Sequence, residues 1–234
     1  MQLALKNVNQ LFNNKQLFDK EVGFTMEQNS AMLVYGGSGS GKTSLFNILS
    51  GIVKPTSGEL FWGDEQIDSP QKANKIRHNY MAVLFSNFTF IKELSIEENI
   101  LIASTLTKSA NVEKNLKFLK EKLLNFKDID ENIDLETLMK KGSVENLSNG
   151  QKEIIAIASV LLIDAKFFLA DEMLRSFPQD TKELLFRRLI AYFKEKGIGF
   201  FYITHWEGAK ELMKELEFSY KLYHIENRLL KEIV

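Results

Sequence analysis

One glycine-rich segment constrains the fold of this chain more than any other feature. Residues 36–43 read GGSGSGKT and satisfy the pattern GxxxxGK[ST]. The apolar run Ala31–Tyr35 precedes the segment and predicts a buried strand. Residues 43–50 are apolar at helical spacing and predict a helix that stops at Gly51. A strand, a glycine turn and a helix in this order form a phosphate loop.

The residue types in this loop suit a nucleoside triphosphate. Glycines let successive backbone N–H groups turn inward around phosphate oxygens, and the helix amino terminus adds its positive dipole. We expect Lys42 to reach the β- and γ-phosphates and the Thr43 hydroxyl to bind Mg²⁺. An ordinary Gly/Ser-rich turn is the alternative, and the flanking strand and helix disfavour it. The predicted nucleotide-binding residues are Gly36, Gly37, Ser38, Gly39, Ser40, Gly41, Lys42, Thr43 and Ser44.

Two downstream segments supply candidate catalytic groups. Asp171 and Glu172 follow the apolar residues 167–170, and carboxylates at the end of a buried strand are costly unless they meet a cation or a proton relay. Asp171 suits the Mg²⁺ shell, and Glu172 suits a base that polarises the attacking water. Alone, the two acids would equally fit a solvated turn. His205 ends the apolar run 200–204; its imidazole suits a bond to the γ-phosphate or the water, or a purely structural role.

The order of predicted elements indicates an α/β fold. Lys166–Ala170 and Gly199–Thr204 read as buried strands joined by a helix over 181–196. Apolar residues at steps of four and three predict an amphipathic helix over 112–126, and residues 150–164 are apolar nearly all round, as in a buried helix. Strands that alternate with helices imply a mostly parallel sheet, in which ligands gather at the carboxyl ends of the strands.

Composition excludes several classes of function. The 234 residues include 30 Lys plus Arg and 31 Asp plus Glu, and no basic cluster stands apart, which argues against a nucleic-acid partner. Without cysteine there is no disulfide, thiolate metal site or Cys nucleophile. The most apolar stretch, Ile154–Ile163, is much shorter than the roughly 18 to 20 residues of a membrane span. The amino terminus lacks a secretory signal, so we expect a cytoplasmic protein.

The pentapeptide LSNGQ at residues 147–151 resembles the ABC signature LSGGQ. The phosphate loop, this pentapeptide, the two acids and His205 reproduce the motif series of ABC ATPases in order, over nearly the whole chain. Ser148 and Gln151 also form an S-x-x-Q capping box, which predicts a helix over 149–164 whose amino terminus can face an anion. The signature residues are Leu147, Ser148, Asn149, Gly150 and Gln151.

This resemblance implies one domain over residues 1–234, with ATP and Mg²⁺ as ligands and ATP hydrolysis as the activity. The implied fold is an α/β P-loop NTPase with a RecA-like parallel sheet core and an antiparallel β subdomain over 1–86 and 166–234. A helical subdomain is inserted at about 87–165. Two protomers, identical or paired with a second ABC ATPase, would sandwich two ATP, each signature meeting the γ-phosphate held by the other protomer. Phe12 falls at the position that stacks on adenine, or serves as a strand core residue.

Three departures from the family pattern bear on the rate. Ser86 stands where Gln is usual, so this weak candidate metal ligand would act only through water, unless Asn87 takes the role after a one-residue shift. Pro178 stands where Asp is usual, which removes a carboxylate and a backbone donor, and Asp180 is a candidate replacement. Trp206 replaces the common Asp after the histidine. We therefore expect a working but slow ATPase.

The economical interpretation is the ATPase subunit of a membrane transporter or envelope machine, peripheral on the inner face of the cell membrane. Transmembrane permease subunits would dock around Phe85, Phe88 and Phe90, although these rings would equally fit inside the helical subdomain. The segment around Phe85 and Phe88 most resembles that of ATPase subunits in the lipoprotein-releasing, macrolide-export and cell-division group. Two alternatives stay open: a soluble ABC ATPase of iron–sulfur cluster assembly, and a slow regulatory member that acts as a scaffold.

Overall fold

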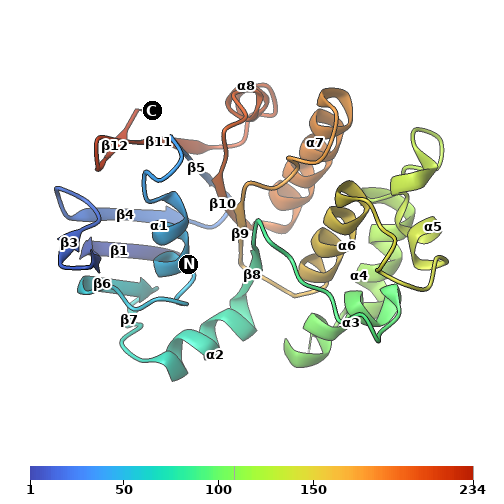
Figure 1. Cartoon of the computed structure of the whole chain (residues 1–234), viewed down its shortest axis with the longest axis horizontal. Coiled ribbons are helices and arrows are strands. Elements are labelled where there is room, and N and C mark those ends of the chain that lie inside the picture. The colour runs from blue at the N-terminus through green and yellow to red at the C-terminus, as the bar shows by residue number, and fades with distance from the viewer. Residues whose placement is uncertain (108, 234) are drawn as a thin grey trace.

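The central element of the computed structural model is a six-stranded sheet in the order β12-β11-β5-β10-β9-β8 (Figure 1). The structure describes residues 1–107 and 109–233, and only the backbone of Phe12. Strands β11, β5, β10, β9 and β8 are parallel, and β12 pairs antiparallel with β11, which confirms the predicted α/β class. The strands are β5 (Ala31–Gly36), β8 (Met81–Leu84), β9 (Phe167–Asp171), β10 (Gly199–Ile203), β11 (Tyr220–Glu226) and β12 (Leu229–Glu232).

A second, antiparallel sheet has the order β4-β1-β6-β7 and lies at the left in Figure 1. Buried and exposed residues alternate along β4, as expected for a sheet with one face on the core and one in water. A short hairpin of β2 and β3 lies nearby in the chain. These strands are β1 (Gln2–Asn9), β2 (Leu11–Phe12), β3 (Lys15–Gln16), β4 (Val22–Glu27), β6 (Ser57–Trp62) and β7 (Glu65–Gln66).

Helices α3 to α6 gather on the side of the molecule away from this sheet, at the right in Figure 1. They occupy the stretch assigned above to a helical subdomain, whose boundaries stay a prediction. Across the two described ranges, no helix is both long and apolar enough to cross a membrane. The α-helices are α1 (Lys42–Leu49), α2 (Pro70–Tyr80), α3 (Ile96–Thr107), α4 (Val112–Phe118), α5 (Leu135–Met139), α6 (Asn149–Leu161), α7 (Gln179–Lys196) and α8 (Gly208–Glu215).

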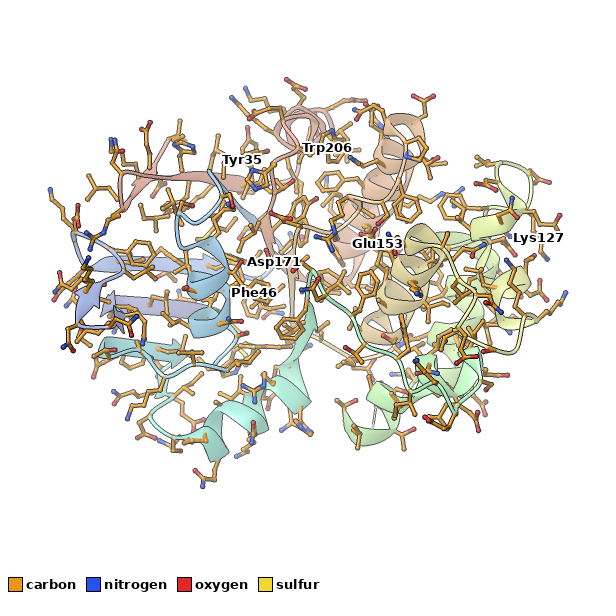
Figure 2. The ribbon with its side chains drawn as sticks, viewed as in Figure 1. Tyr35, Phe46, Lys127, Glu153, Asp171 and Trp206 are labelled. Atoms are coloured by element: carbon orange, nitrogen blue, oxygen red, sulfur yellow. The ribbon has the colours of Figure 1, made fainter. Side chains whose placement is uncertain are left out.

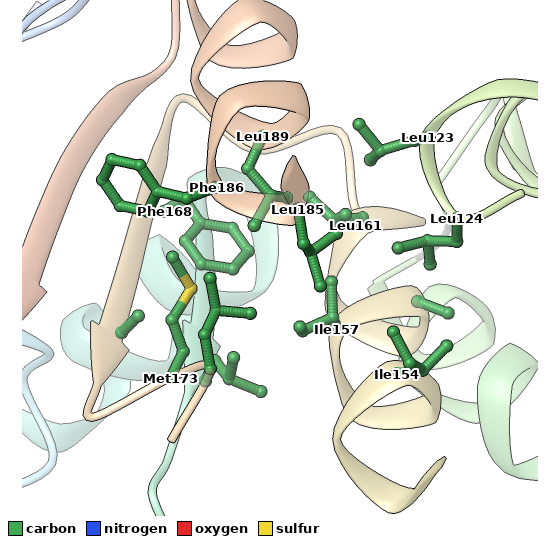
Figure 3. Packing of buried hydrophobic residues seen from close by; sticks show 14 of the residues in the cluster. Leu123, Leu124, Ile154, Ile157, Leu161, Phe168, Met173, Leu185, Phe186 and Leu189 are labelled. Carbon is green, nitrogen blue, oxygen red and sulfur yellow. The ribbon is translucent and has the colours of Figure 1, made fainter. Parts of the chain in front are cut away.

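Side chains of the central sheet alternate between two hydrophobic clusters. In β5, Leu33 packs in the cluster that includes α6 and α7, whereas Met32 and Val34 pack in the cluster with α1 and the antiparallel sheet. Figure 3 shows Phe168 of β9 beside Phe186 of α7, with Leu161 of α6 and Leu124 following toward the helical stretch. The central sheet is therefore packed on both faces.

The predicted helix over 112–126 is wrong in its second half. The α-helix ends at Phe118, and a π-helical turn follows over Leu119–Leu123. The Leu124 N–H donates to the Leu119 carbonyl at 2.8 Å, a wider hydrogen-bond ring that inserts one residue into the turn. As a result Leu123 and Leu124 both face the core, where they are 3% and 0% exposed.

Candidate nucleotide site

Four parallel strands bring the predicted site residues to one edge of the sheet. In the strand register Ile203 lies opposite both Val34 and Asp171, and Leu84 lies opposite Ala170. The segments that leave these strands are the phosphate loop, the Asp171–Glu172 pair, the His205 loop and the Ser86 loop. This is the carboxyl edge of the sheet, where α/β folds place their ligands.

The phosphate loop lines a cleft of about 410 Å³ at the start of α1. Gly41 precedes the helix with φ of 102°, and a Cβ there would lie 3.0 Å from Leu17 Cδ1, so only glycine fits both the conformation and the space. Among the described residues no side chain caps this helix, and its first turn contains no acid, which leaves a positive amino terminus toward the cleft. The cleft is lined by Leu17, Ser38, Gly39, Ser40, Gly41, Lys42, Thr43, Ser44, Glu172 and His205.

Lys42 is held inside the loop by backbone carbonyls. Its ammonium donates to the Gly36 oxygen at 2.8 Å and the Gly37 oxygen at 2.9 Å, and the residue is 6% exposed. Burial lowers the pKa of Lys42, and the carboxylates of Glu172 and Asp171 oppose that shift. Ser40 Oγ is buried without a hydrogen-bond partner in the described part of the chain. A buried cation and an unpaired hydroxyl in one cradle fit a phosphate group.

Two hydroxyl groups converge on one oxygen of Asp171. Thr43 Oγ1 donates to Asp171 Oδ2 at 3.3 Å, and Ser86 Oγ donates to the same oxygen at 3.4 Å. Burial raises the pKa of Asp171, Glu172 raises it further, and the two hydroxyl hydrogen bonds and Lys42 oppose the shift. These hard oxygen donors fit Mg²⁺. Ser86 therefore contacts Asp171 directly, and its predicted action on the metal ion through water stays a prediction.

Glu172 holds its carboxylate between two nitrogen-bearing side chains. His205 Nε2 lies 3.0 Å from Glu172 Oε1, and Arg175 Nη1 lies 3.8 Å from Oε2. The Glu172 backbone has φ of 54°, and its N–H donates to the Ile203 carbonyl at 2.9 Å. A non-glycine residue in this region is strained, a feature that clusters at functional sites. Sequence reasoning missed Arg175, whose only signal was its position three residues after Glu172.

The loop that carries His205 is held by its neighbours. The Trp206 N–H donates to Thr204 Oγ1 at 2.9 Å, and the Tyr35 hydroxyl donates to the Trp206 carbonyl at 3.1 Å. The Trp206 ring packs edge-on against Phe186 at 5.3 Å, and Figure 2 shows Tyr35 close to Trp206. Burial raises the pKa of Tyr35, so its hydroxyl stays a donor. The tryptophan therefore anchors the histidine loop by packing, a role that an aspartate would not provide.

The signature-like residues lie at the start of α6. The predicted capping box is present: Gln151 N–H donates to Ser148 Oγ at 3.3 Å, and Ser148 N–H donates to Gln151 Oε1 at 3.0 Å. The helix ends at Leu161, three residues before the predicted end at Asp164. Within the described ranges, none of the residues 147–151 lines the phosphate-loop cleft. One chain therefore carries the cleft and the signature-like helix as separate surfaces.

Pro178 has a structural role at the start of α7. It occupies the position before the first helical residue, and its carbonyl accepts the Lys182 N–H at 2.9 Å. Asp180 lies in the first turn of α7, where a carboxylate complements the helix dipole. The departure at residue 178 is therefore accommodated as a helix start.

The aromatic residues near Ser86 divide between surface and core. Phe85 is 38% exposed, although its ring meets Phe46 edge-on at 5.5 Å. Phe88 and Phe90 are half-buried against the helical cluster and line a groove of about 410 Å³ whose rim carries charged side chains. The packing alternative therefore holds for Phe88 and Phe90 in part, and docking of a permease at these rings stays a prediction. The Phe12 side chain, predicted to stack on adenine, lies outside the described part of the structure.

Comparison with protein families gives a consistent result. A model described as ABC transporter matches residues 20–175 of this chain. The lipoprotein-releasing system ATP-binding protein LolD of Francisella tularensis subsp. holarctica is 26% identical over 219 residues, which cover 92% of this chain and 91% of that protein. The phosphonates import ATP-binding protein PhnC of Bdellovibrio bacteriovorus is 30% identical over 200 residues, covering 84% and 76%. A putative hemin import ATP-binding protein, HrtA of Staphylococcus haemolyticus, is 27% identical, covering 88% and 90%.

Solved structures share the fold. The bacterial ABC transporter cassette MJ0796, solved as a dimer, has a TM-score of 0.76 at 20% identity and covers 99% of both chains. A dimeric post-hydrolysis state of the same cassette, bound to ADP and Pi, has a TM-score of 0.75 at 21% identity, again with 99% coverage of both chains. The matches span the phosphate loop, the helical stretch and the strand-end acids together.

Proposed function

The chain belongs to the ABC transporter family as an ATP-hydrolysing subunit, and we propose that two copies act beneath transmembrane permease subunits at the inner face of the cell membrane. The observation that carries this proposal is the convergence of Lys42, Thr43, Asp171, Glu172 and His205 at one sheet edge. The relatives named above move lipoproteins, hemin or phosphonates. Because similar ATP-binding subunits serve different cargoes, the permease must select the cargo.

The phosphate loop binds the triphosphate in this proposal. The Gly36–Gly41 backbone and the start of α1 receive the phosphates, and Lys42 exchanges its carbonyl partners for phosphate oxygens. Thr43 and Asp171 hold Mg²⁺, with Ser86 supporting through the shared Asp171 oxygen. When bound, the metal ion neutralises charge on the phosphates.

Glu172 is the proposed general base. Its carboxylate lies at the cleft, one-third exposed, and accepts a proton from the attacking water. His205 holds Oε1 of that carboxylate and lines the same cleft, so it orients both the base and the γ-phosphate.

The start of α6 completes the site of the partner protomer. In the described ranges this helix start does not line the cleft of its own chain, so a second copy is needed to bring it to a γ-phosphate. Two ATP bound between two such protomers close the dimer. Hydrolysis removes the shared ligands and reopens it, and this cycle drives the permease.

The permease docks at the groove of Phe88 and Phe90 beside exposed Phe85. Phe88 lies two residues after Ser86, which contacts Asp171, so a helix inserted in this groove can act on the site through that short segment. The rings that face the core support the groove floor, and the exposed ring supplies apolar contact area.

Two measurements test the proposed function. The purified chain should hydrolyse ATP only with Mg²⁺ present, which a coupled phosphate-release assay measures. A pull-down in mild detergent from the native cells should recover a transmembrane subunit, and Phe88→Ala with Phe90→Ala should lose that subunit while the isolated chain keeps its turnover. A stable set of soluble scaffold proteins in place of a membrane subunit would contradict the transporter role.

A further inference from the structure

We propose that Arg175 is a positioning residue for ATP hydrolysis, which fixes the direction of the Glu172 carboxylate and ties it to the Ser86 loop. This inference rests on the proposed ATPase function. Arg175 touches the base and the loop that leads to the docking groove, so it joins the two parts of the molecule that a transporter must couple.

The guanidinium of Arg175 makes two contacts with different nitrogens. Nη1 lies 3.8 Å from Glu172 Oε2, and Nη2 donates to the Ser86 carbonyl at 2.8 Å. His205 occupies the other oxygen of the same carboxylate, at 3.0 Å. His205 and Arg175 thus flank the Glu172 carboxylate, one at each oxygen. The planar guanidinium fork suits this double task, whereas a lysine ammonium is a single point of charge.

An exposed arginine usually contributes little, because ordering its long side chain costs entropy. The backbone beneath Arg175, however, is fixed. Glu153 of α6 is 1% exposed, and its carboxylate accepts the N–H of Leu174 and, at 3.3 Å, the N–H of Ser176. Leu174 is fully buried and has φ of 67°. The two residues that flank Arg175 are thus anchored to the helix that begins with the signature-like residues.

Burial raises the pKa of Glu153, and hydrogen bonds from the Ser176 and Leu174 segment oppose that shift. Burying a carboxylate is costly unless it is hydrogen-bonded, and the N–H groups of Leu174 and Ser176 supply these bonds. Contacts therefore run from Glu153 of α6 to the residues on both sides of Arg175, and from Arg175 to Glu172 and Ser86.

Steady-state kinetics of Arg175→Ala, Arg175→Lys and the control Arg187→Ala test this role. Arg187 pairs with Glu215 on an exposed surface far along α7 and has no contact with the cleft. R175A should lower kcat by about 10- to 100-fold, the scale of a mispositioned catalytic group, while KM for ATP stays within about twofold. Its Tm should stay within about 2 °C of wild type, because exposed ion pairs add little stability. R187A should keep full turnover.

The lysine variant should recover part of the loss, because it keeps the charge but not the fork. A kcat for R175A equal to wild type would overturn the proposal. So would a rise in KM that matches the fall in kcat/KM, since it would place Arg175 on the nucleotide instead of on Glu172. Equal losses in R175K and R175A would overturn the role of the positive charge. A wild-type chain without any turnover would contradict the proposed function itself, and this role would fall with it.

Discussion

The two surfaces that an ATP molecule would meet differ in how they are built. At the sheet edge, Lys42 and Asp171 are buried charges with shifted pKa values, and Glu172 has a strained backbone. At the start of α6, Ser148 and Gln151 satisfy each other's backbone groups in a capping box. At the sheet edge, a bound ligand would offset the cost of burying charged groups. At the helix start, the capping box already satisfies the backbone groups without a ligand.

This difference separates the surface that would carry out the chemistry, at the sheet edge, from the surface that would recognise a second protomer, at the start of α6. The sheet edge brings side chains from four strand ends together, and only tertiary structure can hold them there. The helix start is local, so five consecutive residues suffice. A helix start of this kind can easily be presented to another protomer, because its structure needs no support from that protomer. The asymmetry explains how one chain supplies both surfaces and still requires a second copy.

The largest expected effect comes from the base at the sheet edge. Glu172→Gln should lower turnover by about two or more orders of magnitude, because the amide cannot accept the proton of the attacking water. ATP affinity should stay within about threefold, since Lys42 and Thr43 are untouched. Phosphate release and binding of a fluorescent ATP analogue measure the two quantities. The exposed Glu211→Gln variant serves as the control, and unchanged hydrolysis in E172Q would reject Glu172 as the base.

A change at the helix start should affect the partner's site and spare its own. Ser148→Arg should reduce turnover at least about tenfold while each protomer still binds ATP, because the added side chain blocks the approach of a second copy. Ser148→Ala separates folding from assembly. It loses only the cap, at a cost of about 1 kcal/mol, and should lower Tm by about 2 to 4 °C. Normal turnover in S148R would show that the helix start takes no part in the site.

The buried charge at the edge predicts a dependence of stability on pH. The raised pKa of Asp171 means that the folded chain binds more protons than the unfolded chain between the ordinary Asp value and the raised one. The free energy of unfolding therefore falls as pH rises through this window. Asp171→Asn should weaken that slope and raise Tm near pH 7 by about 2 to 4 °C in the absence of nucleotide. Thermal melts of both proteins from acid to neutral pH measure it, and identical slopes would contradict the assigned cause.

The smallest effect concerns the loop of His205. Tyr35→Phe removes the donor to the Trp206 carbonyl, a loss of about 1 kcal/mol, and should lower kcat by about fivefold. Tyr220 is the matched control, because its hydroxyl is buried without a hydrogen-bond partner in the described ranges. Y220F should therefore be neutral or slightly stabilising. If both variants behave alike in turnover, the contact with Trp206 does not position the histidine.

Much of the sheet edge could be predicted because the end of each strand is visible in the sequence as the end of an apolar run. Asp171 and His205 follow apolar runs, and the phosphate loop lies between a buried strand and a helix. Parallel pairing then brings the ends together. The capping box of α6 could also be predicted, since it depends only on residues three apart.

The remaining residues were missed because their partners are distant in sequence. Glu153 reads as a polar position on a helix until Leu174 and Ser176 are seen to donate to it. Arg175 reads as an ordinary surface charge, and its contact with Ser86 spans 89 residues. The π-helical turn at Leu119–Leu123 was missed because the apolar residues there follow the spacing of an α-helix. Core packing, which the sequence does not show, favours the wider turn.

The central claim is that neither surface forms a complete site within one chain. Light scattering of E172Q at micromolar concentration, with and without ATP and Mg²⁺, tests it most directly. We expect a monomer without nucleotide and a species of twice the mass with it, because the slow variant retains ATP between the phosphate loop of one protomer and the α6 start of the other. S148R combined with E172Q should remain a monomer in both conditions. A monomeric E172Q that is saturated with ATP would contradict the shared site.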